Sequence, residues 1–186
     1  MSKKLTSVLL TILILATQGC ATGAKTGAMI SELSEETLIT SDSLLYNAIE
    51  VGDVSGGQDT NPAWASKVSN DNFADALENS LKLHSMSGIK NNNYVVNANL
   101  KELKQPLLGF DMKVTAIAAY ELIDKESQTT LFTSEITTPY TATVGEALLG
   151  VKRLRLANEG AIKENIREFI TQLINHFSSP SPSPQD

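Results

Sequence analysis

The sequence is poor in the residues that build many specialised sites. It has one cysteine, and aromatic residues make up 5% of its 186 positions. A single cysteine excludes a disulfide within the chain. So few aromatic rings disfavour a site that recognises sugars or nucleobases by stacking. The formal net charge of −6 gives no general attraction to nucleic acid, so we expect no nucleic-acid partner.

Motifs for catalysis and cofactor binding are also missing. The chain contains no Gly-x-Ser-x-Gly turn, no phosphate-binding loop and no dinucleotide fingerprint. His84 and His176 stand near the expected ends of helices, where a cation is favourable, and neither has a second ligand at metal-binding spacing. We interpret both as ordinary surface or capping residues. The sequence therefore predicts no enzyme, no catalytic residue, no cofactor and no metal.

The first 19 residues have the layout of a secretory signal peptide. Two lysines are followed by an apolar run from Leu5 to Ala16, which is interrupted only by hydroxyl side chains. This run of about a dozen residues is shorter than the roughly 20 that a membrane-spanning helix needs. We expect residues 1–19 to be removed, so that the mature chain begins at Cys20.

Residues 15–20 read Leu-Ala-Thr-Gln-Gly-Cys, which resembles the lipobox of bacterial lipoproteins. Gly19 and Cys20 fit that pattern, while Thr17 and Gln18 stand where leucine and a small residue are commonest. The resemblance implies lipid attachment at Cys20. Because Ala21 and not aspartate follows, it also implies sorting to the outer membrane, with the mature chain facing the periplasm.

The alternative is an ordinary cleaved signal that leaves Cys20 as a free thiol. An unpaired thiol is a liability in an oxidising compartment, and acylation would remove it. We therefore prefer the lipoprotein interpretation.

Composition divides the mature chain into three parts. Residues 20–41 are small and polar, which is typical of a flexible tether, here a lipidated one. Residues 42–177 contain the periodic apolar patterns of a single periplasmic domain. Residues 178–186 alternate serine with proline and predict a disordered tail.

Periodicity predicts six elements in residues 42–177. Strands are expected at 44–54, 94–100, 110–123 and 129–138, and helices from Asn70 or Asp71 to Ser87 and from Thr143 to Phe177. Thr143 and Glu146 have the spacing of a capping box, and Gly150 is a position where the last helix could be interrupted. An apolar stripe from Leu148 to Phe177 follows the same helix.

The order β-α-β-β-β-α predicts an α+β fold. We expect a two-layer sandwich of about four mainly antiparallel strands, with two helices on one face. The second face of such a sheet can remain open to solvent or to a partner.

Two surface features are candidates for partner contact. Trp64 lies in a polar loop and could be an interface anchor, or it could instead close one end of the core. Lys152, Arg153 and Arg155 concentrate positive charge in an acidic chain and could receive an acidic partner or a lipid headgroup. The alternative for the basic trio is structural, since Arg155 can pair with Glu159 one helical turn later.

With its elements placed, the chain resembles small outer-membrane lipoproteins whose periplasmic domain is of the TolB amino-terminal or curli-secretion lipoprotein type. The resemblance rests on Gly19-Cys20, Phe73–Leu77, Val114–Asp124 and Ala157–Leu173. It implies a non-catalytic accessory, scaffold or assembly subunit that a lipid holds on the membrane beside other envelope proteins. The alternative is a periplasmic carrier of a small or lipidic ligand between sheet and helices.

Overall fold

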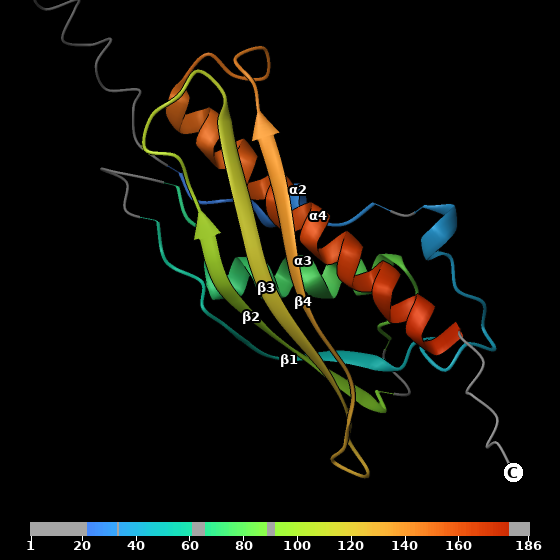
Figure 1. Cartoon of the computed structure of the whole chain (residues 1–186). Coiled ribbons are helices and arrows are strands. Elements are labelled where there is room, and N and C mark those ends of the chain that lie inside the picture. The colour runs from blue at the N-terminus through green and yellow to red at the C-terminus, as the bar shows by residue number, and fades with distance from the viewer. Residues whose placement is uncertain (1–21, 33, 61–65, 89–91, 179–186) are drawn as a thin grey trace, which may run out of the picture.

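The computed structural model describes residues 22–32, 34–60, 66–88 and 92–178 (Figure 1). The predicted signal peptide, Cys20, Trp64 and most of the predicted Ser/Pro tail lie outside these ranges.

Four strands form one mixed sheet in the spatial order β1-β2-β3-β4. They are β1 (Ile49–Ser55), β2 (Tyr94–Lys104), β3 (Met112–Asp124) and β4 (Thr130–Ala142). The β2–β3 and β3–β4 pairs are antiparallel, whereas β1 runs parallel to β2. A helical crossover separates β1 from β2, which is the kind of connection that parallel strands require. The predicted α+β fold and strand number are confirmed.

Alternation along β3 shows how the sheet is oriented. Val114, Ala116, Ala118, Tyr120 and Leu122 are buried, and the residues that alternate with them are partly exposed. Figure 1 shows both long helices, α3 (Asn70–Leu83) and α4 (Gly150–Ser178), on the same side of the sheet. The predicted two-layer arrangement is therefore correct, and the opposite face of the sheet carries no helix in the described chain.

Helix α3 is capped at Ser69, before the predicted caps Asn70 or Asp71, and it ends at Leu83, four residues before the predicted end at Ser87. Ser69 is its N-cap, since the Ser69 side chain accepts a hydrogen bond from the backbone N–H of Asn72. His84 is the C-cap, and its Nδ1 lies 2.7 Å from the carbonyl oxygen of Ser80. Ser85 follows with a φ of 57° and stops the helix. His84 is thus a capping residue, but a buried one.

Helix α4 begins at Gly150, and the prediction of a start at Thr143 is wrong. The Glu146 carboxylate does accept hydrogen bonds from the backbone N–H and hydroxyl of Thr143, but these close a turn and not a helix. Arg153 explains the later start. Its Nη1 donates to the carbonyl oxygens of Ala147 and Leu148, both at 2.7 Å, which an earlier helix would have used for its own backbone.

The core between sheet and helices is built around stacked rings. Tyr120 on β3 stacks on Phe169 of α4, with ring centroids 4.2 Å apart, and meets the edge of Phe73 from α3 at 6.3 Å. All three rings are buried, and the Tyr120 hydroxyl donates to Asn165. Burial raises the pKa of Tyr120, which therefore stays protonated.

The segment predicted as a tether is folded wherever it is described. A short helix α2 (Thr26–Met29) and a 3-10 turn η2 (Glu35–Thr37) lie within it. Ala24 and Met29 are buried in the common core, and the Ser31 N–H donates to Ser80 on α3. These contacts involve partners far along the chain. Residues 22–32 therefore pack on the helices, and the folded domain extends beyond the predicted start at residue 42.

Candidate functional site

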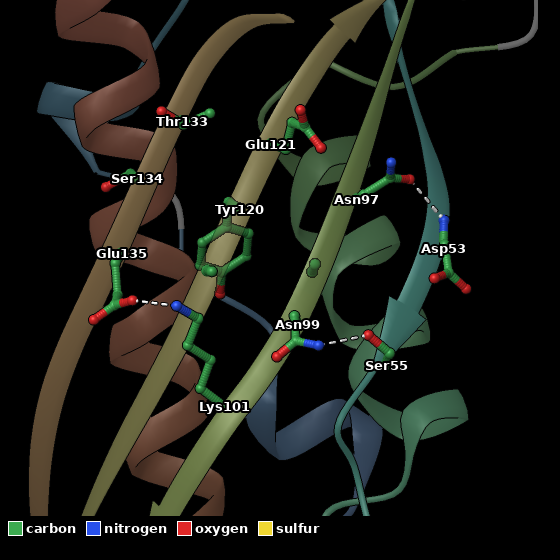
Figure 2. A pocket seen from close by; sticks show the side chains of 12 residues that line it. Asp53, Ser55, Asn97, Asn99, Lys101, Tyr120, Glu121, Thr133, Ser134 and Glu135 are labelled. Atoms are coloured by element: carbon green, nitrogen blue, oxygen red, sulfur yellow. Dashed lines mark hydrogen bonds and ion pairs between the residues drawn. The ribbon is translucent and has the colours of Figure 1, made fainter.

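The open face of the sheet carries a polar groove of about 580 Å³ (Figure 2). All four strands contribute to it. Its lining consists of Asp53, Ser55, Asn97, Ala98, Asn99, Lys101, Ala119, Tyr120, Glu121, Thr133, Ser134 and Glu135.

Strand register explains why a hollow forms there. Ala119 on β3 pairs with Asn99 on one side and with Glu135 on the other. A methyl group therefore lies between two longer side chains on the open face. The shorter side chain leaves a depression along the centre of the sheet, with polar groups on both of its walls.

An irregularity in β1 builds the far wall. The pairing of β1 with β2 shifts between Val51 and Val54, which frees the backbone N–H of Asp53 from the regular ladder. Asn97 compensates, because its Oδ1 accepts a hydrogen bond from that N–H at 2.8 Å. A Cβ on Gly52 would lie 2.5 Å from the same oxygen, so glycine is needed for this approach.

The remaining contacts hold polar side chains in place across the face. Asn99 donates from Nδ2 to the Ser55 hydroxyl at 2.8 Å, and Lys101 forms an ion pair with Glu135 (Figure 2). Both ion-pair side chains are about half exposed, so the pair adds little to stability. These groups remain accessible to hydrogen bonds from a bound molecule.

The side chains of this groove can offer hydrogen bonds and charge to a bound molecule. Three carboxylates, Asp53, Glu121 and Glu135, face one lysine, which leaves an excess of negative charge. The lining residues include no histidine or cysteine. Within the described residues there is also no group of three or more histidine, cysteine or acidic side chains that could hold a metal ion.

The structure separates the members of the basic trio. Lys152 is exposed, whereas Arg153 is buried against the carbonyl groups before α4. Arg155 donates from Nη1 to the Thr22 hydroxyl at 2.7 Å, and its Nε lies 3.3 Å from Glu159. Two of the three charges therefore hold the protein itself together. Cys20 and Trp64, the other predicted site residues, lie outside the described residues.

Glu159 ties the N-terminal segment to α4. Its Oε1 accepts a hydrogen bond from the Lys25 N–H at 2.9 Å. Burial raises the pKa of the Glu159 carboxyl, although the Lys25 N–H and the positive charge of Arg155 act in the opposite direction. Lys25, Arg155 and Glu159 therefore attach the N-terminal segment to α4, and none of the three lines the groove.

Sequence reasoning predicted an open sheet face but did not identify the groove. The signal was present in β2, where Asn97 and Asn99 alternate with buried residues. Asparagine is depleted in strands, so two asparagines on the outward side of one strand indicate that this side forms hydrogen bonds and does not pack in a core. The contribution of β4 to the groove could not be predicted from the sequence, because it depends on how β4 is paired in register with β3, and β3 with β2.

No family model matches the sequence, and no curated protein matches it either. Solved structures do match its fold. A Xanthomonas campestris protein of the DUF330 family superposes with a TM-score of 0.55 at 9% identity, covering 75% of this chain and 90% of that one. A Caulobacter crescentus protein described as a lipoprotein gives 0.51 at 10% identity, covering 73% and 95%.

The fold is thus shared with a protein described as a bacterial lipoprotein. At these identities the likeness concerns the fold alone, and it does not single out the TolB or curli-secretion type. Among the described residues, no helix combines the length and apolar character that crossing a bilayer requires.

Proposed function

We propose that this protein is a non-catalytic accessory subunit of the bacterial envelope. A lipid on Cys20 would hold it on the outer membrane, facing the periplasm, and the open face of the sheet would bind another envelope protein. The observation that carries the proposal is the groove on the open face, to which all four strands contribute hydrogen-bonding and charged side chains.

Two further observations support the proposal. The lipobox-like residues Gly19-Cys20 precede a fold that lipoproteins adopt. The groove lies on the face opposite the helices, where a second protein can approach without displacing any described element (Figure 2). A wide, shallow surface suits a protein partner better than a small ligand, which usually needs a deeper cavity.

The alternative of a carrier requires room between sheet and helices. The rings of Phe73, Tyr120 and Phe169 fill that layer, and all three are buried. A ligand there would have to displace packed rings at the cost of their mutual contacts. Native mass spectrometry that detected a stoichiometric co-purified lipid would nonetheless favour the carrier over the accessory subunit.

The anchor is tested by comparing the natural chain with a Cys20→Ser variant. We expect the natural protein to fractionate with outer membranes and to show an intact mass that starts at Cys20 with added acyl groups. The variant should be unprocessed or released. A natural protein that is free in the periplasm without acyl mass would overturn the membrane-anchored part of the proposal.

The groove is tested by site-specific photo-crosslinking in intact cells. A photoreactive residue at Asn99, on the open face, should give a discrete protein adduct, and the same residue at exposed Asp75 on α3 should not. Ala119→Arg, which fills the hollow, should lower the Asn99 adduct several-fold, while Asp75→Arg should leave it unchanged. Equal adducts from both positions, or none from Asn99, would contradict the proposed partner-binding face.

A further inference from the structure

Two loops expose large apolar side chains at one end of the molecule. Between β2 and β3, Leu107, Leu108 and Phe110 are 97%, 90% and 87% exposed, and between β4 and α4, Leu148 and Leu149 are 85% and 61% exposed. We call these five side chains the apolar tip. Single exposed apolar residues are ordinary on protein surfaces, but a group of large ones marks a surface that contacts something else.

The two loops belong to the same end of the sheet. Met112 at the start of β3 pairs with Ala142 at the end of β4, so the loops leave the sheet side by side. The Val144 N–H also donates to Asp111 Oδ1 at 3.2 Å, which links one loop to the other. Figure 1 shows both loops at the upper end, away from the β3–β4 turn.

Hydrogen bonds fix the second loop in its exposed position. The Arg153 guanidinium binds the carbonyl oxygens of Ala147 and Leu148, and Glu146 holds Thr143. The leucines that follow are thus displayed on an ordered loop. A surface that is ordered before binding loses less conformational entropy when it binds.

The predicted lipid attachment point is joined to this end of the molecule by a short length of chain. Thr22 receives a hydrogen bond from Arg155, near the start of α4. Cys20 is two residues before Thr22, a span of at most about 7 Å. Arg155 follows Leu149 by six residues, which is about 9 Å along a helix axis. A lipid on Cys20 would therefore enter a membrane within reach of the apolar tip.

Two lysines near the tip are placed to meet a membrane surface, while the acidic side chains of the same loops, Asp111 and Glu146, accept backbone hydrogen bonds within the loops. Lys113 and Lys152 are both exposed, one near the start of β3 and the other in the first turn of α4. Lysines that lie this close to the apolar tip can contact anionic lipid headgroups. Elements that lie in the interface bury apolar side chains about 5–10 Å into the boundary between headgroups and acyl chains. Protruding leucines and a phenylalanine match that depth.

We propose that the apolar tip inserts into the interface of the bilayer that holds the Cys20 lipid. This rests on the proposed lipid anchor, because the anchor is what brings the bilayer within reach. The insertion gives the domain a second point of attachment and so fixes its orientation. The strands then rise away from the membrane, and the groove on the open face points sideways toward neighbouring envelope proteins.

The test places one fluorescent probe at the tip and another far from it. The acylated full chain is reconstituted into vesicles of phosphatidylethanolamine and phosphatidylglycerol, where Cys20 no longer offers a thiol. Leu108→Cys carries the tip probe, and Glu126→Cys, in the β3–β4 turn at the other end, carries the control. Both positions are exposed, so neither label should disturb packing. Doxyl lipid should quench the Leu108 probe several-fold more than the Glu126 probe, and iodide several-fold less.

Two results would overturn the insertion of the tip. The Leu108 probe could respond to both quenchers as the Glu126 probe does, which would show a tip in water. It could also be shielded from iodide without being reached by doxyl lipid, which would indicate a second copy or another protein. Vesicle flotation and acyl mass, measured on the same sample, test the anchor separately. If both were absent, the lipid anchor itself would be refuted, and the inference with it.

Discussion

Asn165 joins α4 to two strands through a buried network. Its amide oxygen accepts from the Tyr120 hydroxyl at 2.8 Å, and its amide nitrogen donates to the Ile136 carbonyl at 2.9 Å and to Thr138 Oγ1 at 3.1 Å. In a low-dielectric interior, losing such a side chain leaves several partners unsatisfied.

We expect Asn165→Ala to lower the free energy of unfolding by about 2–4 kcal/mol, from the small cavity and the unpaired Tyr120 hydroxyl. Urea unfolding measures the change. Asn79→Ala on the exposed side of α3 is the control, with an expected change within about 0.5 kcal/mol. Equal stability of the two variants would show that the buried network contributes nothing.

Glu159 should make stability depend on pH in the opposite sense from most carboxylates. Burial raises the pKa of the Glu159 carboxyl in the folded protein above its value in the unfolded chain. At a pH between these two pKa values, the carboxyl is therefore protonated more often in the native state than in the unfolded state. Stability from this group is therefore lost as pH rises through that window. The free energy of unfolding of the natural protein minus that of Glu159→Gln should fall as pH rises.

The matched control for this prediction is Glu146→Gln. Hydrogen bonds from Thr143 hold the pKa of the Glu146 carboxyl below its usual range, so its stabilisation is present above the unfolded pKa and lost as pH falls. Urea unfolding at a series of acidic to neutral pH values should give difference curves of opposite slope for the two variants. Parallel curves would contradict the effect of burial on Glu159.

At the scale of elements, α4 and β4 meet at a glycine. A Cβ placed on Gly160 would lie 2.4 Å from Cγ of Tyr140, at the base of the ring, so the ring would have to move. Overpacking of this kind typically costs about 1–3 kcal/mol, more than the roughly 1 kcal/mol that alanine gains over glycine in a helix. Gly160→Ala should therefore destabilise the protein, as measured by the urea midpoint.

A double variant separates the steric clash with Tyr140 from the other effects of Gly160→Ala. In a Tyr140→Ala background the space is free, so adding Gly160→Ala should be neutral or stabilising by up to about 1 kcal/mol. Gly27→Ala, where nothing lies within 4 Å of the new Cβ, shows the effect of a glycine replacement without a clash. A penalty of equal size in both backgrounds would place its origin away from Tyr140.

The sequence predicted an element correctly where the burial of one of its faces produces a regular pattern of apolar residues. Alternation in β3 and the part of the predicted stripe from Leu154 to Leu173 gave the correct buried sides. The start of that stripe was wrong, because Leu148 and Val151 are 85% and 38% exposed. The start of α4 failed because Arg153 captures carbonyl groups from outside the local pattern. Strand β1 begins at Ile49 and not at residue 44, because the residues before it form turns, which backbone hydrogen bonds such as that from the Tyr46 N–H to the Ser43 carbonyl close.

At the scale of the whole molecule, the N-terminal segment decides how close the domain lies to its anchor. An extended tether from residue 20 to residue 42 could span about 70 Å, whereas a segment docked from Thr22 onward leaves about 7 Å. The sequence could not reveal this docking, because small residues such as Ala24 become buried only through surfaces of α3 and α4 that lie far along the chain.

Met29 provides the test of this docking, since its side chain is fully buried among residues of the common core. Met29→Ala should cost about 2–4 kcal/mol of unfolding free energy, as expected for a core methionine. It should also make residues 22–41 sensitive to proteolysis below the unfolding transition. Leu38→Ala, in the same segment but 59% exposed, should change neither property. A Met29→Ala protein as stable and as resistant as the natural one would mean that the segment is a tether after all, free to hold the domain far from the membrane.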